Sequence, residues 1–113
     1  MGLSQQGCAA LEPAAAAQVR RTPLWHVVLL DDNDHTYDYV IEMLGDLFHH
    51  PVERAYQMAC EVDGSGSVVV DTTVFERAEF KRDQVQAYGC DWRLDYSRGS
   101  MRAVLRRATS EDQ

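Results

Sequence analysis

A short apolar run that ends in a cluster of hydrogen-bond acceptors is the feature that most constrains how this chain can fold. Residues 24–30 read Leu-Trp-His-Val-Val-Leu-Leu, and residues 31–35 read Asp-Asp-Asn-Asp-His. The run is short enough to be a buried strand, and the amphipathic pattern that begins at Tyr37 predicts a helix. Acceptors gathered at a strand-to-helix junction are typical of a site for a positively charged group. Two such groups fit: a metal ion, or an ammonium group such as the free N-terminus of a peptide.

The acidic charge of the chain is concentrated around this junction. The net charge is −7 over 113 residues, and residues 31–63 hold nine acids against one base, whereas residues 64–113 hold eight of each. Asp31 and Asp32 are adjacent carboxylates that repel one another, so we expect a positive partner beside them. Asp34 and Asp38 are better explained as residues of a soluble loop and of the first helical turn.

No pattern in the sequence indicates nucleic acid or a membrane as a partner. Phosphate binding requires clustered basic residues, and only Arg102, Arg106 and Arg107 form such a cluster. We interpret these arginines as part of a solvated strand and tail. No apolar stretch approaches the roughly 20 residues that span a bilayer. We expect a cytoplasmic monomer.

The spacing of cysteine and histidine indicates neither a metal nor a cofactor. The cysteines are Cys8, Cys60 and Cys90, and the histidines outside the junction are His26, His49 and His50. The cysteines are odd in number and lack Cys-x-x-Cys spacing, so neither a zinc site nor a disulfide framework is predicted. The histidines lack a matched cysteine or paired i, i+4 spacing, and we expect them at the surface or at helix ends.

The chain divides into an extension, one domain and a short tail. Residues 1–23 mix glycine, serine, glutamine, proline and a run of four alanines, which predicts a flexible N-terminal extension. Residues 24–108 form the predicted domain, and residues 109–113 a disordered tail. Within the domain we expect Asp63 to Gly66 to stop the second helix, and Trp92 and Tyr96 to cover an edge of the core. The predicted elements are a strand at 24–30, helices at 37–48 and from Pro51, a strand at 67–73, a helix at 74–88 and a strand at 101–105.

This order of elements predicts a small single-domain α+β sandwich of the order β-α-α-β-α-β. We expect its three-stranded sheet to be antiparallel, with three helices on one face. One alternative is a magnesium-binding signalling domain, because a strand ending in Leu-Leu-Asp-Asp-Asn resembles the first strand of response-regulator receiver domains, with Asp71 as phosphate acceptor. A receiver has parallel strands that are each followed by a helix. Here two helices follow the first strand, and no lysine lies beyond Lys81.

Three segments, in this order and at this spacing, resemble the ClpS adaptor family. They are Val-Val-Leu-Leu-Asp-Asp-Asn at 27–33 leading into the Tyr-Val-Ile helix, Pro-Val-Glu-Arg-Ala at 51–55, and Glu-Arg-Ala-Glu-Phe-Lys at 76–81. The resemblance runs from about Trp25 to Leu105. Adaptors of this family hand proteins with a destabilising first residue, or N-degron, to a Clp unfoldase and protease. The resemblance therefore implies a non-enzymatic adaptor.

The resemblance also implies which residues bind the substrate. The residues at the family positions that grip the α-ammonium and first peptide unit are Asp31, Asp32, Asn33 and Asp63. Those at the positions of the hydrophobic pocket for the first side chain are His35, Tyr37, Val40 and Val62. The family has a histidine where this chain has Asp63, and a smaller gatekeeping side chain where it has Tyr37. Asp63 is open to two interpretations: a carboxylate that accepts from an ammonium, or a residue of an ordinary Asp-Gly turn.

The resemblance implies a second surface for the N-terminal domain of a Clp AAA+ unfoldase of the ClpA or ClpC type. Glu76 and Lys81 occupy the positions that carry this docking. A solvated helix face shows the same charges, and the sequence alone favours that interpretation. A protein that keeps the fold but uses the groove for another partner is a further alternative, which Asp63 and Tyr37 keep open.

Overall fold

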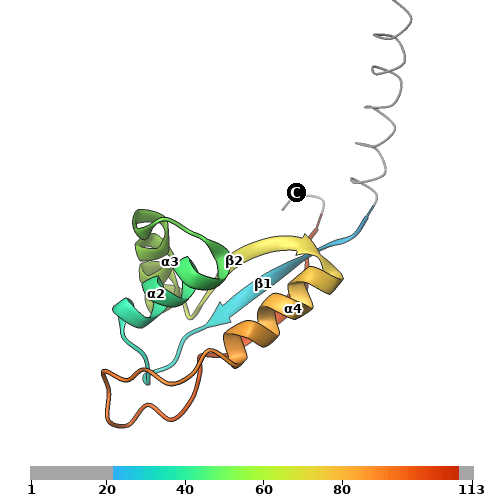
Figure 1. The fold of residues 1–113 in the computed structure, drawn as a ribbon. Coiled ribbons are helices and arrows are strands. Elements are labelled where there is room, and N and C mark those ends of the chain that lie inside the picture. The colour runs from blue at the N-terminus through green and yellow to red at the C-terminus, as the bar shows by residue number, and fades with distance from the viewer. Residues whose placement is uncertain (1–21, 110–113) are drawn as a thin grey trace, which may run out of the picture.

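The computed structural model describes residues 22–109, so most of the predicted extension and tail lies outside the described residues. The elements follow the predicted order (Figure 1). They are β1 (Leu24–Leu30), α2 (Tyr37–Phe48), α3 (Val52–Ser65), β2 (Ser67–Val74), α4 (Phe75–Gln86) and β3 (Ala103–Arg107).

The sheet is built around β1, which lies between β2 and β3 and pairs antiparallel with both. Its register with β2 runs from Leu24 opposite Val74 to Leu30 opposite Ser67, with a shift between Val27 and Val28. The antiparallel sheet confirms the predicted fold class. It also makes the receiver alternative wrong, because a receiver needs a parallel, doubly wound sheet.

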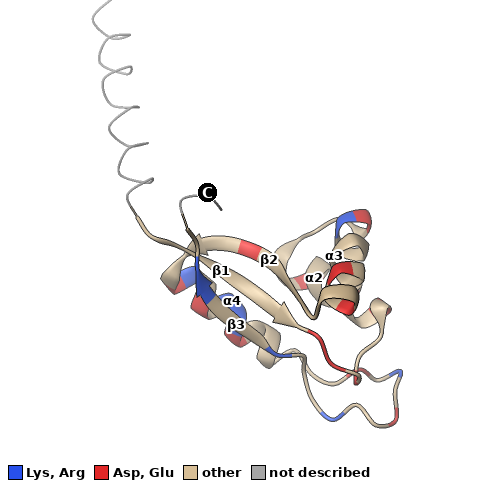
Figure 2. Cartoon of the chain, turned by 180° about the vertical axis from the view of Figure 1, so that it is seen from behind, with Lys and Arg blue, Asp and Glu red and all other residues tan. Residues whose placement is uncertain are grey.

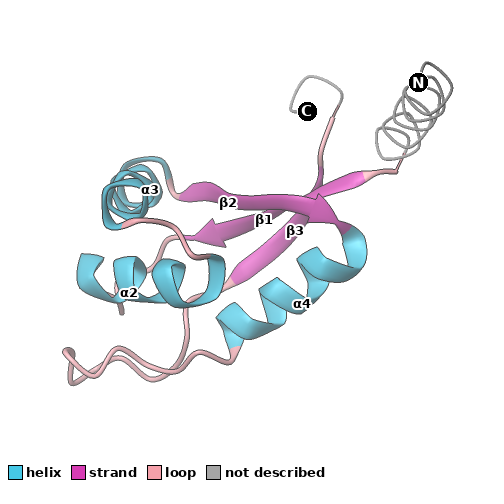
Figure 3. Ribbon diagram, turned by 45° about the horizontal axis from the view of Figure 1, so that its top comes forward, coloured by secondary structure: helices cyan, strands magenta, loops and turns pink. Residues whose placement is uncertain are grey.

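The three helices gather against the sheet and enclose one core. Figure 3 shows α2 and α4 side by side under the strands, with α3 beside α2 near the start of β2. Apolar residues at helical spacing on α2 and α3 meet alternate residues of β1 and β2, which is how an amphipathic helix covers one face of a sheet. The largest buried side chains in this core are Leu29, Tyr39, Met43, Leu44 and Met101.

The second helix ends later than predicted. It continues through residues 63–65 and stops at Gly66, which has φ = 89° and whose N–H donates to the Val62 carbonyl at 2.9 Å. Glycine adopts this left-handed conformation without steric cost, so Gly66, rather than the Asp-Gly pair, ends the helix. Asp63 is therefore a helical residue in the last turn of α3, and its interpretation as a turn residue is wrong.

The last strand is shifted by two residues from its predicted position. It spans Ala103–Arg107, and Met101, which was expected to begin it, is a buried residue of the preceding loop. The register with β1 sets this boundary, since Ala103 pairs with Leu29 and Arg107 with Trp25. Figure 2 shows acidic residues on α2, α3 and the segment after β1, both acidic and basic residues on α4, and basic residues on β3.

Candidate functional site

A small pocket lies where β1 ends, between the first turn of α2 and the last turns of α3. Its volume is about 40 Å³. The residues that line it are Asp31, Asp32, His35, Thr36, Tyr37, Val40, Ala59, Val62, Asp63 and Met101. Seven of the eight residues expected to bind a substrate thus lie around one cavity, while Asn33 is exposed and does not line it. Their role in binding stays a prediction.

Three lining residues were missed by sequence reasoning. Ala59 lies on the same face of α3 as Val62, one turn earlier, so helical spacing was the signal that could have identified it. Thr36 is the N-cap of α2, and its hydroxyl accepts from the Tyr39 N–H at 3.2 Å. Met101 comes from the loop before β3, and no local pattern could place it beside the pocket.

The carboxylates of the junction are in two different environments. Asp32 accepts from the Asp34 N–H at 2.9 Å and contacts His35 Nδ1 at 2.7 Å. His35 Nε2 lies 2.6 Å from the Gly99 carbonyl, so the ring connects Asp32 to the loop before β3. Within residues 22–109, no group donates to the Asp31 carboxylate, which is exposed at the pocket. Asp31 is thus the carboxylate best placed to accept from an added cation.

A hydrogen bond crosses the mouth of the pocket. The hydroxyl of Tyr37, the first residue of α2, donates to Asp63 Oδ2 near the end of α3 at 2.7 Å. This bond to a carboxylate is the main cause that raises the pKa of the Tyr37 phenol well above its ordinary value. The Tyr56 ring lies beside it, with ring centroids 6.0 Å apart. The two helices that flank the cavity are thereby joined over it.

Asp91 holds the loop between α4 and β3 against the start of α2. The sequence analysis did not identify this residue. Its side chain is fully buried and accepts from Thr36 N at 2.7 Å, Thr36 Oγ1 at 2.8 Å, Arg93 N at 3.0 Å and Arg93 Nη1 at 3.2 Å. Burial alone would raise the pKa of Asp91, but the hydrogen bonds from Thr36 and Arg93 outweigh it and lower the pKa to about 2. Asp91 therefore holds Thr36, the N-cap of α2, in place beside the pocket.

The aromatic residues of the same loop do not cover the core, so that expectation is wrong. Trp92 is 77% exposed and Tyr96 is 58% exposed. The Arg93 guanidinium lies over the Trp92 ring, 4.6 Å from its centroid, and forms a cation–π contact with it at the surface. Asp91 and Ser97 are buried instead, and Ser97 Oγ accepts from the Asp91 N–H at 2.9 Å.

The two residues expected to dock an unfoldase differ in exposure. Glu76 is exposed at the start of α4, whereas Lys81 is only 8% exposed. Lys81 Nζ donates to the Leu47 carbonyl at 2.5 Å and lies 5.6 Å from the centre of the Phe48 ring. The Leu47 carbonyl is one of the last four of α2, which have no partner inside the helix. The ammonium of Lys81 therefore ties α4 to the end of α2 and faces away from solvent.

His26 does not lie at the surface or at a helix end, so that expectation is wrong for this histidine. It is 4% exposed, inside the sheet, with Nδ1 2.7 Å from Thr72 Oγ1. Its neighbour Val27 pairs with Asp71, so Asp71 lies in mid-strand and far along the sheet from the junction acids. His49 and His50 do lie at the end of α2, as expected. Residues 22–109 contain no group of three or more histidine, cysteine, aspartate or glutamate side chains that could hold a metal ion.

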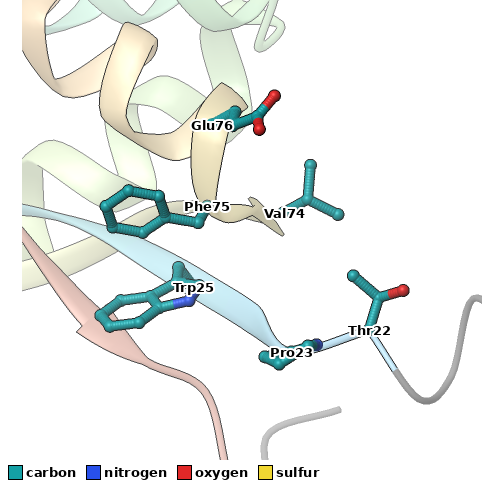
Figure 4. Close-up of a pocket in the computed structure, with 6 residues that line it drawn as sticks. All are labelled: Thr22, Pro23, Trp25, Val74, Phe75 and Glu76. Carbon is teal, nitrogen blue, oxygen red and sulfur yellow. The ribbon is translucent and has the colours of Figure 1, made fainter.

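A second, larger hollow lies at the opposite end of β1. It has a volume of about 410 Å³ and is lined by Thr22, Pro23, Trp25, Val74, Phe75 and Glu76. Figure 4 shows the rings of Trp25 and Phe75 next to each other, and their centroids are 5.1 Å apart in an edge-to-face arrangement. None of the residues predicted to bind a substrate lines it, but the predicted docking residue Glu76 does.

Comparison with known proteins decides the family. The family model described as ATP-dependent Clp protease adaptor protein ClpS matches residues 20–91. This chain belongs to the ClpS family. The Clp protease adapter ClpS of Alkalilimnicola ehrlichii is 36% identical over 78 residues, which is 69% of this chain and 70% of that protein. The adapter of Nautilia profundicola is 40% identical over 58 residues, so the match covers 51% of this chain and only 60% of the Nautilia protein.

A solved ClpS structure has the same fold. It is that of Agrobacterium tumefaciens ClpS2 bound to L-phenylalaninamide, with a TM-score of 0.64 and 20% sequence identity. The superposition covers 78% of this chain and all of the ClpS2 chain. The predicted recognition and the predicted fold are thus confirmed. No helix in residues 22–109 is long and apolar enough to cross a membrane.

Proposed function

We propose that this ClpS-family chain binds the free α-amino group and the bulky apolar first side chain of N-degron proteins, and delivers them to a Clp AAA+ unfoldase. One observation carries the proposal: the carboxylates of Asp31, Asp32 and Asp63 line the same pocket as a group of apolar side chains, which are those of Val40, Ala59, Val62 and Met101. An α-ammonium next to an apolar side chain is the ligand that matches both parts. No redox group or nucleophile is required, since the protein acts as a non-enzymatic adaptor.

The energies of these two contacts suit an adaptor. The α-amino group of a peptide has a pKa of about 7.7–8.0, so it is mostly cationic at neutral pH. Each hydrogen bond to a charged group contributes about 1.5–3 kcal/mol, and burial of a leucine or phenylalanine side chain contributes about 1.5–3 kcal/mol. Two such hydrogen bonds and one buried side chain contribute roughly 4.5–9 kcal/mol before ordering costs, a range that includes the micromolar value of about −8 kcal/mol. A micromolar complex forms readily and still releases its substrate.

The ligand of the ClpS2 structure supports this assignment. L-Phenylalaninamide carries a free α-amino group and an apolar side chain. These are the two groups that the acidic rim and the apolar wall of the present pocket would bind. A ClpS-fold protein that uses the groove for a different partner would not require both groups, and the following experiment separates the two cases.

Acetylation of the peptide N-terminus tests the proposal. We expect a fluorescent peptide that begins with phenylalanine to bind, and its N-acetylated form to bind at least tenfold more weakly, because it loses one or more charge-assisted hydrogen bonds. Fluorescence anisotropy measures both affinities. A free-amine peptide that begins with glycine is the matched control for the side chain. Equal affinity for the free and acetylated phenylalanine peptides would rule the proposed function out.

The surface around Glu76 is our proposed docking site for the N-terminal domain of the unfoldase, of the ClpA or ClpC type. Glu76 is exposed at the start of α4 and lines the same hollow as Trp25 and Phe75, with its carboxylate pointing away from the two rings (Figure 4). Lys81 would contribute by holding α4 in place, since its ammonium is bound to Leu47. Residues 1–23 would then engage the unfoldase during delivery.

Reversal of the charge at Glu76 tests this surface. We expect Glu76→Arg to weaken binding to the isolated unfoldase domain at least fivefold, with unchanged affinity for the peptide, because rim charges mainly affect partner association. Isothermal titration calorimetry measures the first and anisotropy the second. Glu79→Arg, on the same helix, is the control. If Glu79→Arg weakened the complex and Glu76→Arg did not, the surface would be wrongly placed.

A further inference from the structure

The hydrogen bond between Tyr37 and Asp63 holds an aromatic ring at the mouth of the pocket. Tyr37 begins α2 and Asp63 lies near the end of α3, and the bond of 2.7 Å between their side chains spans the cavity that both residues line. The Tyr37 ring also lies beside the Tyr56 ring, with centroids 6.0 Å apart. The ring therefore has one defined position while this bond is made.

In this position the pocket is too small for the side chain of a large first residue. Its volume is about 40 Å³, whereas a cavity that binds benzene in a protein core has a volume of about 150 Å³. The space must come from a wall that can move. Val40, Ala59, Val62 and Met101 are each at most 4% exposed and packed in the core, whereas Tyr37 is 37% exposed. Of these side chains, the Tyr37 ring is therefore the one whose movement away from the cavity costs the least free energy.

We propose that Tyr37 and Asp63 form a latch that sets the specificity of the pocket, an inference that rests on the proposed function. In the closed state the phenol bonds to Asp63 and the ring occupies the space of a bulky first side chain. Binding requires the ring to swing out, which frees Asp63 Oδ2 for the α-ammonium. A ligand with an ammonium replaces the hydrogen bond that is lost, whereas a blocked amine does not. The latch thereby adds to the discrimination between free and blocked chain ends.

Removal of the phenol hydroxyl tests the latch. Tyr37→Phe keeps the ring but removes the bond to Asp63, so the open state is populated before the ligand arrives. Because the apparent dissociation constant is the intrinsic one divided by the open fraction, we expect the variant to bind L-phenylalaninamide and a phenylalanine-first peptide about three- to tenfold more tightly. Tyr56→Phe removes a hydroxyl from the neighbouring ring, which has no bond to Asp63, and we expect no change in affinity.

A second variant shows whether Asp63 is the partner through which the hydroxyl acts. Asp63→Asn removes the charged acceptor, so the gain from Tyr37→Phe should shrink to about twofold or less in that background. Calorimetry or anisotropy on the four combinations of the two substitutions provides the cycle, and circular dichroism verifies their folding. The latch would be overturned if Tyr37→Phe bound the free-amine ligands no more tightly than the wild type. The proposed function would stay intact in that case, provided that the wild type binds the free-amine peptide and rejects the acetylated peptide. If neither the wild type nor any variant binds the free-amine ligands, both the proposed function and the latch are wrong.

Discussion

Replacement of Asp91 by alanine should destabilise the protein by about 3–4 kcal/mol, measured by urea unfolding at pH 7. The carboxylate is fully buried and accepts from the backbone and hydroxyl of Thr36 and from Arg93. The substitution leaves these donors without their acceptor, and an unpaired buried polar group costs more than the bond itself contributed. Because Thr36 caps α2, the start of the pocket helix should fray before the rest of the fold.

The dependence on pH distinguishes this carboxylate from an ordinary acid. The pKa of Asp91 in the folded protein is about 2, below its value of about 3.9 in an unfolded chain. Its contribution is therefore fully present above about pH 4 and is lost as the pH falls toward 2. The difference in unfolding free energy between wild type and Asp91→Asn should be constant from about pH 5 to 7 and shrink below about pH 4. Asp95→Asn, in the same loop, is the matched control. A difference that does not change between about pH 5 and 2 would contradict the role assigned to Asp91.

Lys81→Met should reduce the free energy of unfolding by about 2–3 kcal/mol. Methionine keeps the aliphatic length of the side chain but removes the ammonium that donates to the Leu47 carbonyl at the end of α2. That carbonyl would then be left without a donor, and the favourable interaction of a cation with the C-terminal end of a helix would also be lost. Chemical denaturation measures the change.

The control for Lys81 is on the same helix. Arg77 is exposed on α4, so Arg77→Met removes a positive charge without a buried bond, and its effect on stability should stay within about 0.5 kcal/mol. Equal stability of Lys81→Met and Arg77→Met would show that Lys81 is not a structural tie between α4 and α2. Because Lys81→Met is expected to be less stable, its binding to an unfoldase domain should be measured at a temperature where the variant is folded.

The sequence predicted what local patterns control. The bounds of β1 and α2 follow from an apolar run and from the helical spacing that begins at Tyr37, and both match the structure. The acidic side of the pocket was also predictable, because Asp31, Asp32 and His35 come from one short segment. Asp63 was assigned a place only through the family resemblance, and its bond to Tyr37 joins residues 26 apart in the chain.

Contacts between distant segments account for what the sequence did not reveal. Asp91 bonds to a residue 55 positions away and Lys81 to one 34 positions away, and neither has a periodic or motif signal of that pairing. Met101 reaches the pocket only because its loop lies against α2. The end of α3 was misjudged for a different reason: the Asp-Gly pair indicates a turn, but Gly66 three residues later has the left-handed conformation that ends the helix.

Because Lys81 is buried, its chemical reactivity can be used to measure how often α4 separates from α2. The sequence contains no other lysine, and this one is 8% exposed. An acylating reagent that attacks side-chain amines therefore has no ready target in the folded domain and must wait until α4 separates from α2. The rate at which Lys81 is acylated would measure the frequency of that separation, and mass spectrometry could follow it with and without an unfoldase domain bound to α4.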